Sequence, residues 1–133
     1  MPGERILVVD DNPTNLKLAR MLLVSEGYEI RTCSNAEEAL GVVDEFRPSL
    51  ILMDVQLPGM DGLELTRLLK ADPARRHIVV IALTAYAMKG DQEKALSAGC
   101  DGYVSKPIDL DALLRLVAEQ LSRAASSMLL QDE

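Results

Sequence analysis

Five short apolar runs that alternate with helical patterns constrain this fold more than any other feature of the sequence. The runs cover Ile6–Val9, Glu29–Cys33, Leu50–Met53, Ile78–Leu83 and Gly102–Ser105. The first, third and fourth are continuously apolar, which is typical of parallel strands that helices cover on both faces. The second and fifth are more polar, as expected of strands at the edges of a sheet. The alternation predicts an α/β fold with a five-stranded parallel sheet and helices on both of its faces.

Capping residues predict where the intervening helices begin. The predicted N-caps are Asn12, Asn35, Asp61 and Asp109. A proline follows the first cap, and a glutamate stands three residues after the second and the third, which is the capping-box pattern. The last helix carries the clearest apolar stripe, formed by Leu110, Leu113, Leu114, Val117 and Leu121. The fourth, over about Met88 to Ala98, has a polar first half, so it is either a weakly anchored helix that shifts easily or an ordinary exposed one.

The size and the charge of the chain exclude several classes of function. Its 133 residues suit one domain, which we assign to residues 1–123, followed by a short, frayed tail over residues 124–133. The net charge of −7, without any cluster of Lys and Arg, disfavours direct binding to nucleic acid or to an anionic membrane. No run has the length of a signal-peptide core or a membrane-spanning helix, so we expect a cytoplasmic protein. Cys33 and Cys100 are then expected to be reduced thiols.

Polar side chains follow four of the predicted strands. The first strand is followed by Asp10 and Asp11, the third by Asp54, the fourth by Thr84, and the fifth by Lys106. Sites in open parallel sheets form at the carboxyl ends of the strands. We therefore expect three carboxylates, a hydroxyl and an ammonium group to meet in one crevice.

Three clustered carboxylates repel one another unless a cation neutralises them. Mg²⁺ prefers a few carboxylate ligands together with retained waters, and it can bridge to phosphoryl oxygens beside a nucleophilic carboxylate. Thr84 would then donate a hydrogen bond to the phosphoryl group, and Lys106 would pair with its charge. Simpler interpretations remain: Asp10 and Asp11 suit a helix N-terminus, Thr84 a turn, and Lys106 the surface. Asp54 is harder to explain in that way, because it follows a buried strand and needs a partner.

The segments around these residues resemble those of bacterial response-regulator receiver domains, over roughly Ile6 to Leu121. The matching segments are Ile6-Leu7-Val8-Val9-Asp10-Asp11-Asn12, Leu52-Met53-Asp54-Val55-Gln56-Leu57-Pro58-Gly59-Met60-Asp61-Gly62, Ala82-Leu83-Thr84-Ala85 and Lys106-Pro107. They stand in the order and at the separations of that family. Residues 85–91 are further similar to receivers of hybrid sensor kinases and of single-domain cell-cycle regulators. The resemblance implies the flavodoxin-like strand order 2-1-3-4-5, in which Cys33 and Cys100 lie near opposite edges and cannot pair.

The same resemblance implies an acceptor and a metal site. Asp54 is the residue that accepts the phosphoryl group, and the implied cofactor is Mg²⁺. The implied metal ligands are Asp10, Asp11, Asp54 and the backbone carbonyl of Gln56.

Three further residues have roles by resemblance alone. Thr84 and Lys106 match the residues that contact the phosphoryl group. Thr84 and Tyr103 match the switch pair, in which the aromatic ring turns inward as Thr84 moves toward the phosphoryl group.

The implied function is a phosphorylation-dependent signalling switch rather than a turnover enzyme. Its phosphodonor would be a histidine kinase or a histidine phosphotransfer protein. A downstream protein would be contacted through the face built from the fourth helix, the fifth strand and the fifth helix, by a monomer or a phosphorylation-dependent dimer.

Three alternatives stay open at this point. A receiver excised from a hybrid histidine kinase would show the same residues, although the Met1 start and the acidic end favour an independent chain. A phosphorylation-independent binding module is expected to lack Asp54, Thr84 or Lys106, and all three are present. A phosphohydrolase would need a second acid near its nucleophile and a capping insertion, which the short loops do not show.

Overall fold

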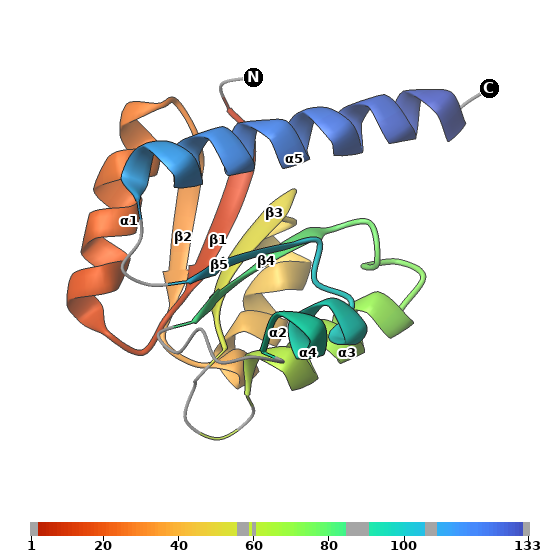
Figure 1. Cartoon of the computed structure of the whole chain (residues 1–133), viewed down its shortest axis with the longest axis horizontal. Helices are drawn as coiled ribbons and strands as arrows, with labels where there is room; N and C mark the ends of the chain where they lie inside the picture. The colour runs from red at the N-terminus through yellow and green to blue at the C-terminus, as the bar shows by residue number, and fades with distance from the viewer. Residues whose placement is uncertain (1–2, 56–58, 60, 85–90, 106–108, 132–133) are drawn as a thin grey trace.

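The computed structural model describes residues 3–55, 59, 61–84, 91–105 and 109–131, and its centre is a five-stranded parallel sheet (Figure 1). The strands are β1 (Arg5–Val9), β2 (Glu29–Cys33), β3 (Leu50–Asp54), β4 (Val79–Thr84) and β5 (Gly102–Ser105). Their order is β2-β1-β3-β4-β5, which confirms the order implied by resemblance and places the two polar strands at the edges. β3 and β4 run one residue further than predicted, so Asp54 and Thr84 are the last residues of their strands.

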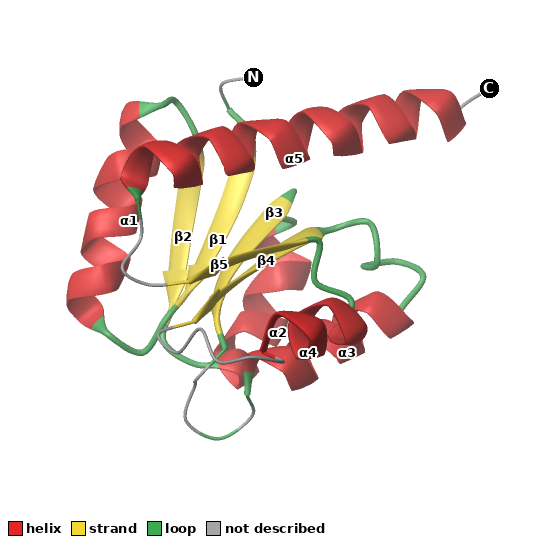
Figure 2. Cartoon of the chain, viewed as in Figure 1, coloured by secondary structure: helices red, strands yellow, loops and turns green. Residues whose placement is uncertain are grey.

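Helices cover both faces of the sheet (Figure 2). They are α1 (Pro13–Ser25), α2 (Ala36–Phe46), α3 (Gly62–Ala71), α4 (Asp91–Ala98) and α5 (Leu110–Gln131). α4 begins at Asp91, and residues 88–90 of the predicted helix lie outside the described residues. α5 continues to Gln131 through the region expected to be a frayed tail, where alanine, leucine and methionine favour a helix. Among the described residues, no helix combines the length and the apolar character needed to cross a membrane.

Two hydrophobic cores lie on the two faces of the sheet, because successive strand residues point to opposite sides. Leu7 and Ile51 point toward α2, α3 and α4, where they pack with buried residues of these helices. Leu50 and Ile81 point the other way, toward α1 and α5. Every residue of β3 is buried, so any polar group at its end enters an environment with little water.

All four predicted N-caps are confirmed. The side chains of Asn12, Asn35, Asp61 and Asp109 accept hydrogen bonds from backbone amides of the first turns that follow them. Caps of this kind each stabilise a helix by about 1 kcal/mol. The starts of these four helices are therefore set by local sequence.

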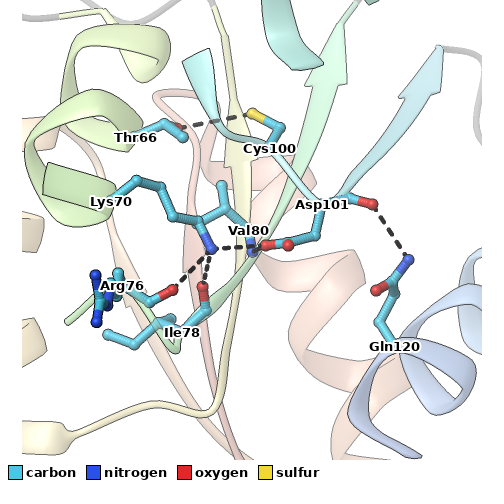
Figure 3. A network of polar contacts seen from close by, with 8 residues as sticks. All are labelled: Thr66, Lys70, Arg76, Ile78, Val80, Cys100, Asp101 and Gln120. Atoms are coloured by element: carbon cyan, nitrogen blue, oxygen red, sulfur yellow. Dashed lines mark hydrogen bonds and ion pairs between the residues drawn. The ribbon is translucent and has the colours of Figure 1, made fainter. Parts of the chain in front are cut away.

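A polar network joins several elements at the other end of the sheet, away from the carboxyl ends of the strands (Figure 3). Lys70 Nζ of α3 donates to three oxygens: the carbonyls of Arg76 and Ile78, at 3.1 and 2.7 Å, and Asp101 Oδ2, at 2.8 Å. Asp101 Oδ2 also accepts from the amide of Val80 at 2.9 Å. Gln120 of α5 donates to the carbonyl of Asp101 at 3.2 Å. The network therefore ties α3, β4 and α5 to the loop that precedes β5.

Both cysteines are buried and free, which confirms that they do not pair. Cys33 ends the edge strand β2, whereas Cys100 precedes the opposite edge strand β5. Burial raises the pKa of the Cys33 thiol to about 11, with the nearby charge of Glu38 as a smaller cause. Burial also raises the pKa of Cys100. Both side chains are therefore neutral thiols at neutral pH.

Candidate metal centre

Three acidic residues come together where β1 and β3 end. Asp10, Asp11 and Asp54 each offer a carboxylate oxygen, and these oxygens lie within 4.8 Å of one another. Asp10 and Asp54 are buried, with 2% and 6% of their surface exposed, whereas Asp11 is exposed. The structure thus brings together the three acids that the sequence places at separate strand ends.

The sheet explains why these acids meet. β1 and β3 are parallel neighbours in which Val9 pairs with Met53, so the residues that follow, Asp10 and Asp54, reach the same edge. The amide of Asp10 donates to the carbonyl of Cys33 at 3.1 Å and thereby continues the pairing with β2. Strand pairing, and not a loop, therefore holds the backbones of Asp10 and Asp54 in place.

The carboxylate of Asp10 is held at both of its oxygens. Oδ1 accepts from the backbone amide of Asn12 at 2.9 Å, and Oδ2 accepts from the side-chain amide of Asn15 at 3.2 Å. Asn15 was not among the residues predicted for the site. A signal was present, because Asn15 occupies the helix position at which α2 and α3 carry glutamate.

A glycine packs directly against the backbone of Asp54. Gly62 is the first residue of α3, and its amide donates to the carbonyl of Val55 at 3.1 Å. A Cβ atom at Gly62 would lie 2.6 Å from the carbonyl oxygen of Asp54 and 3.1 Å from Cγ of Met53. The start of α3 can therefore approach the end of β3 only because residue 62 has no side chain.

The remaining predicted residues occupy the neighbouring part of the sheet or lie outside the described residues. Thr84 is the last residue of β4, directly after Leu83, which pairs with Asp54. Tyr103 of β5 is half-buried and packs against the core on the side of α2, α3 and α4. Gln56 and Lys106 lie outside the described residues, as does the side chain of Thr84. The roles assigned to these residues stay predictions.

The donor set of the three acids suits a hard divalent cation. All three ligand atoms are carboxylate oxygens, the type that Mg²⁺ prefers. Mg²⁺ holds oxygens at about 2.0–2.1 Å in an octahedron, so two of its ligands lie at most about 4 Å apart. The three oxygens lie within 4.8 Å of one another, so the carboxylates would move closer together to reach that geometry. The residues present therefore fit a magnesium site.

With this sheet order and these acids at its edge, the chain belongs to the family of response regulator receiver domains, whose family model matches residues 6–118. It is similar to the polar-differentiation response regulator DivK of Brucella anthropi, with 47% identity over 119 residues that cover 90% of this chain and 97% of that protein. Its role is thus that of a receiver domain in two-component signalling.

Two solved structures show the same fold. The CheY-like response regulator receiver domain protein of Methanospirillum hungatei has a TM-score of 0.86 and 34% identity, covering 94% of this chain and 98% of that one. The receiver domain of sensor histidine kinase PA1611 of Pseudomonas aeruginosa has a TM-score of 0.83 and 36% identity, covering 90% and 98%. That receiver holds a magnesium ion coordinated in its active site cleft.

Proposed function

We propose that this receiver domain is a switch in which Asp54 accepts a phosphoryl group from a phosphohistidine donor with the help of Mg²⁺. The observation that carries the proposal is the place of Asp54 at the end of a fully buried strand, close to two other carboxylates. Carboxylates held this close together repel one another, and a divalent cation would relieve that repulsion. The magnesium ion in the Pseudomonas aeruginosa receiver supports the choice of metal.

The transfer requires one bond to form and one to break. A carboxylate oxygen of Asp54 attacks the phosphorus of the donor, and the P–N bond to the imidazole breaks as the new P–O bond forms. The imidazole leaves with the electron pair and then takes up a proton from solvent. Phosphoryl transfer depends mainly on positioning and charge neutralisation, so the chain acts as an acceptor rather than a turnover enzyme.

The proposed ligands of Mg²⁺ are Asp10, Asp11, Asp54 and the backbone carbonyl of Gln56. When bound, the ion would neutralise negative charge on the phosphoryl oxygens. Asp10 is already oriented by its two hydrogen-bond donors, so little reorganisation is needed on its side.

The proposed response links Thr84 and Lys106 to the phosphoryl group, and Thr84 to Tyr103. Tyr103 is half-buried and packs against the core on the side of α2, α3 and α4. Its inward turn would change the face formed by α4, β5 and α5. We propose that a downstream protein reads this face, with the chain as a monomer or a phosphorylation-dependent dimer.

The first turns of α1 offer a surface on which the phosphodonor can dock. α1 begins directly after the acidic cluster, and its exposed side includes Leu18 and Met21, which are 52% and 64% exposed. Apolar side chains that are exposed together on one helix are typical of interaction sites. We propose that a histidine kinase or a phosphotransfer protein packs a helix against them and so brings its phosphohistidine to Asp54.

Intact-mass spectrometry after incubation with acetyl phosphate tests the chemistry. We expect a single phosphoryl adduct on the wild-type chain that requires Mg²⁺. The Asp54→Asn variant should show no adduct, whereas Asp111→Asn, at an exposed acid in the first turn of α5, should react as the wild type does. An adduct that persists on Asp54→Asn would refute the assignment of the acceptor.

A phosphorylated histidine donor protein separates the docking surface from the chemistry. Replacing both Leu18 and Met21 by serine should slow transfer from that donor and leave the reaction with acetyl phosphate unchanged. Equal rates from the donor protein on both chains would eliminate α1 as the docking surface. If neither acetyl phosphate nor the donor protein modifies Asp54, the chain is instead a constitutive binding module.

A further inference from the structure

The first turn of α1 departs from the capping pattern of the two helices that follow. In α2 and α3, the third helical residue is Glu38 or Glu64, and its amide donates to the capping side chain. In α1 the equivalent residue is Asn15, and the first turn carries no acid at all. An acidic side chain here would interact favourably with the helix dipole, so another interaction must explain why α1 has none.

The hydrogen bonds of this turn supply that reason. In a capping box, the third residue reaches back to the backbone amide of the cap. Here the backbone amide of the cap, Asn12, donates to Asp10 Oδ1 at 2.9 Å instead. The side chain of Asn15 reaches past the cap and donates to Asp10 Oδ2 at 3.2 Å. Both donors of the turn therefore serve the carboxylate of Asp10.

These two donors fix the plane of the Asp10 carboxylate. Asp10 is only 2% exposed, so solvent water has little access to replace a lost donor. Each carboxylate oxygen has two lone-pair sites, so an N–H bond to an oxygen is compatible with a cation bound to the same oxygen. A glutamate at position 15 would instead add a fourth carboxylate beside Asp10, Asp11 and Asp54.

We infer that Asn15 is a positioning residue of the metal site, which orients the carboxylate of Asp10 for a divalent cation without binding that cation itself. The inference rests on the proposed function, since it concerns the same magnesium site. Partners that orient metal ligands commonly change metal affinity or activity by about 10–100-fold when they are removed. The backbone amide of Asn12 remains as a second donor, so the lower end of that range applies.

Titration calorimetry with MgCl₂ on the full chain tests the inference. We expect Asn15→Ala to weaken Mg²⁺ binding about tenfold relative to the wild type. Thr14→Ala is the matched control, because Thr14 lies in the same turn with an exposed side chain, and its affinity should stay within about twofold of the wild type. Urea unfolding in Mg²⁺-free buffer checks that each variant is folded before titration.

The kinetics provide a second readout that a general loss of structure would not reproduce. With acetyl phosphate, the Mg²⁺ concentration for half-maximal phosphorylation of Asn15→Ala should rise about tenfold, while the rate at saturating Mg²⁺ changes less than about threefold. Equal affinities of Asn15→Ala and wild type would overturn the inference, as would a loss of affinity of the same size in Thr14→Ala. A wild-type chain that binds no Mg²⁺ would instead refute the proposed function.

Discussion

Replacing Gly62 by alanine should destabilise the protein, although alanine is the better helix former. The added Cβ would lie 2.6 Å from the carbonyl oxygen of Asp54, far inside ordinary contact distance. The obstructing atom belongs to the backbone of β3, which is paired on both sides and cannot move as a flexible side chain does. α3 must therefore shift away from the sheet and weaken the bond from the amide of Gly62 to the carbonyl of Val55.

Overpacking of this kind typically costs about 1–3 kcal/mol, and the gain in helix propensity offsets at most about 1 kcal/mol. We expect a net loss of about 1–2 kcal/mol in the free energy of unfolding. In a domain of this size, the loss corresponds to a fall in Tm of roughly 3–10 °C.

Urea unfolding followed by circular dichroism measures the stability, with Gly41→Ala as the matched control. Gly41 lies inside α2, and a Cβ there would meet nothing within 4 Å. Gly41→Ala should therefore raise the stability by up to about 1 kcal/mol. A Gly62→Ala variant that matches or exceeds the stability of the wild type would show that α3 can move freely, and the steric reasoning would then be wrong.

Two further predictions concern the polar network and the buried thiols. Lys70→Met removes three hydrogen bonds from a charged donor that is 20% exposed, so we expect a loss of about 2 kcal/mol in urea unfolding. Arg123→Met is the control, because it breaks an ion pair with Glu119 in which the two side chains are 71% and 57% exposed. It should change the free energy of unfolding by less than about 0.5 kcal/mol. Equal losses in the two variants would show that the network of Lys70 stabilises the fold no more than an exposed ion pair does. The pKa of Cys33 is raised from 9.0 to about 11, so the thiol ionises first in the unfolded chain and the stability should fall as pH rises across this range. Cys33→Ala should lose less stability over the same pH interval, and identical slopes would contradict a raised pKa.

The local sequence was sufficient to predict the strands, the helix starts and the general position of the site. The continuously apolar runs predicted β1, β3 and β4 within a residue, because buried parallel strands exclude polar residues. The more polar runs predicted the edge strands β2 and β5. Asn12, Asn35, Asp61 and Asp109 marked the helix starts, because capping depends on neighbouring residues only. Asp10, Asp11 and Asp54 could be assigned to one edge, since parallel strands place their carboxyl ends together. The strand order came from family resemblance, because periodicity alone does not specify which strands are neighbours.

Tertiary structure decided the contacts between residues whose roles no local pattern reveals. In the sequence, Gly62 is indistinguishable from an ordinary loop glycine. Only the structure shows that the start of α3 packs there against the backbone at the end of β3. Lys70 and Asp101 are 31 positions apart and resemble surface charges, yet they meet where α3 and the loop before β5 converge. Asn15 differs from the glutamates at the same position of α2 and α3, but only the fold shows that its amide reaches Asp10. In each case the partner is chosen by packing, because the energy of a buried contact depends on which surfaces the chain brings together.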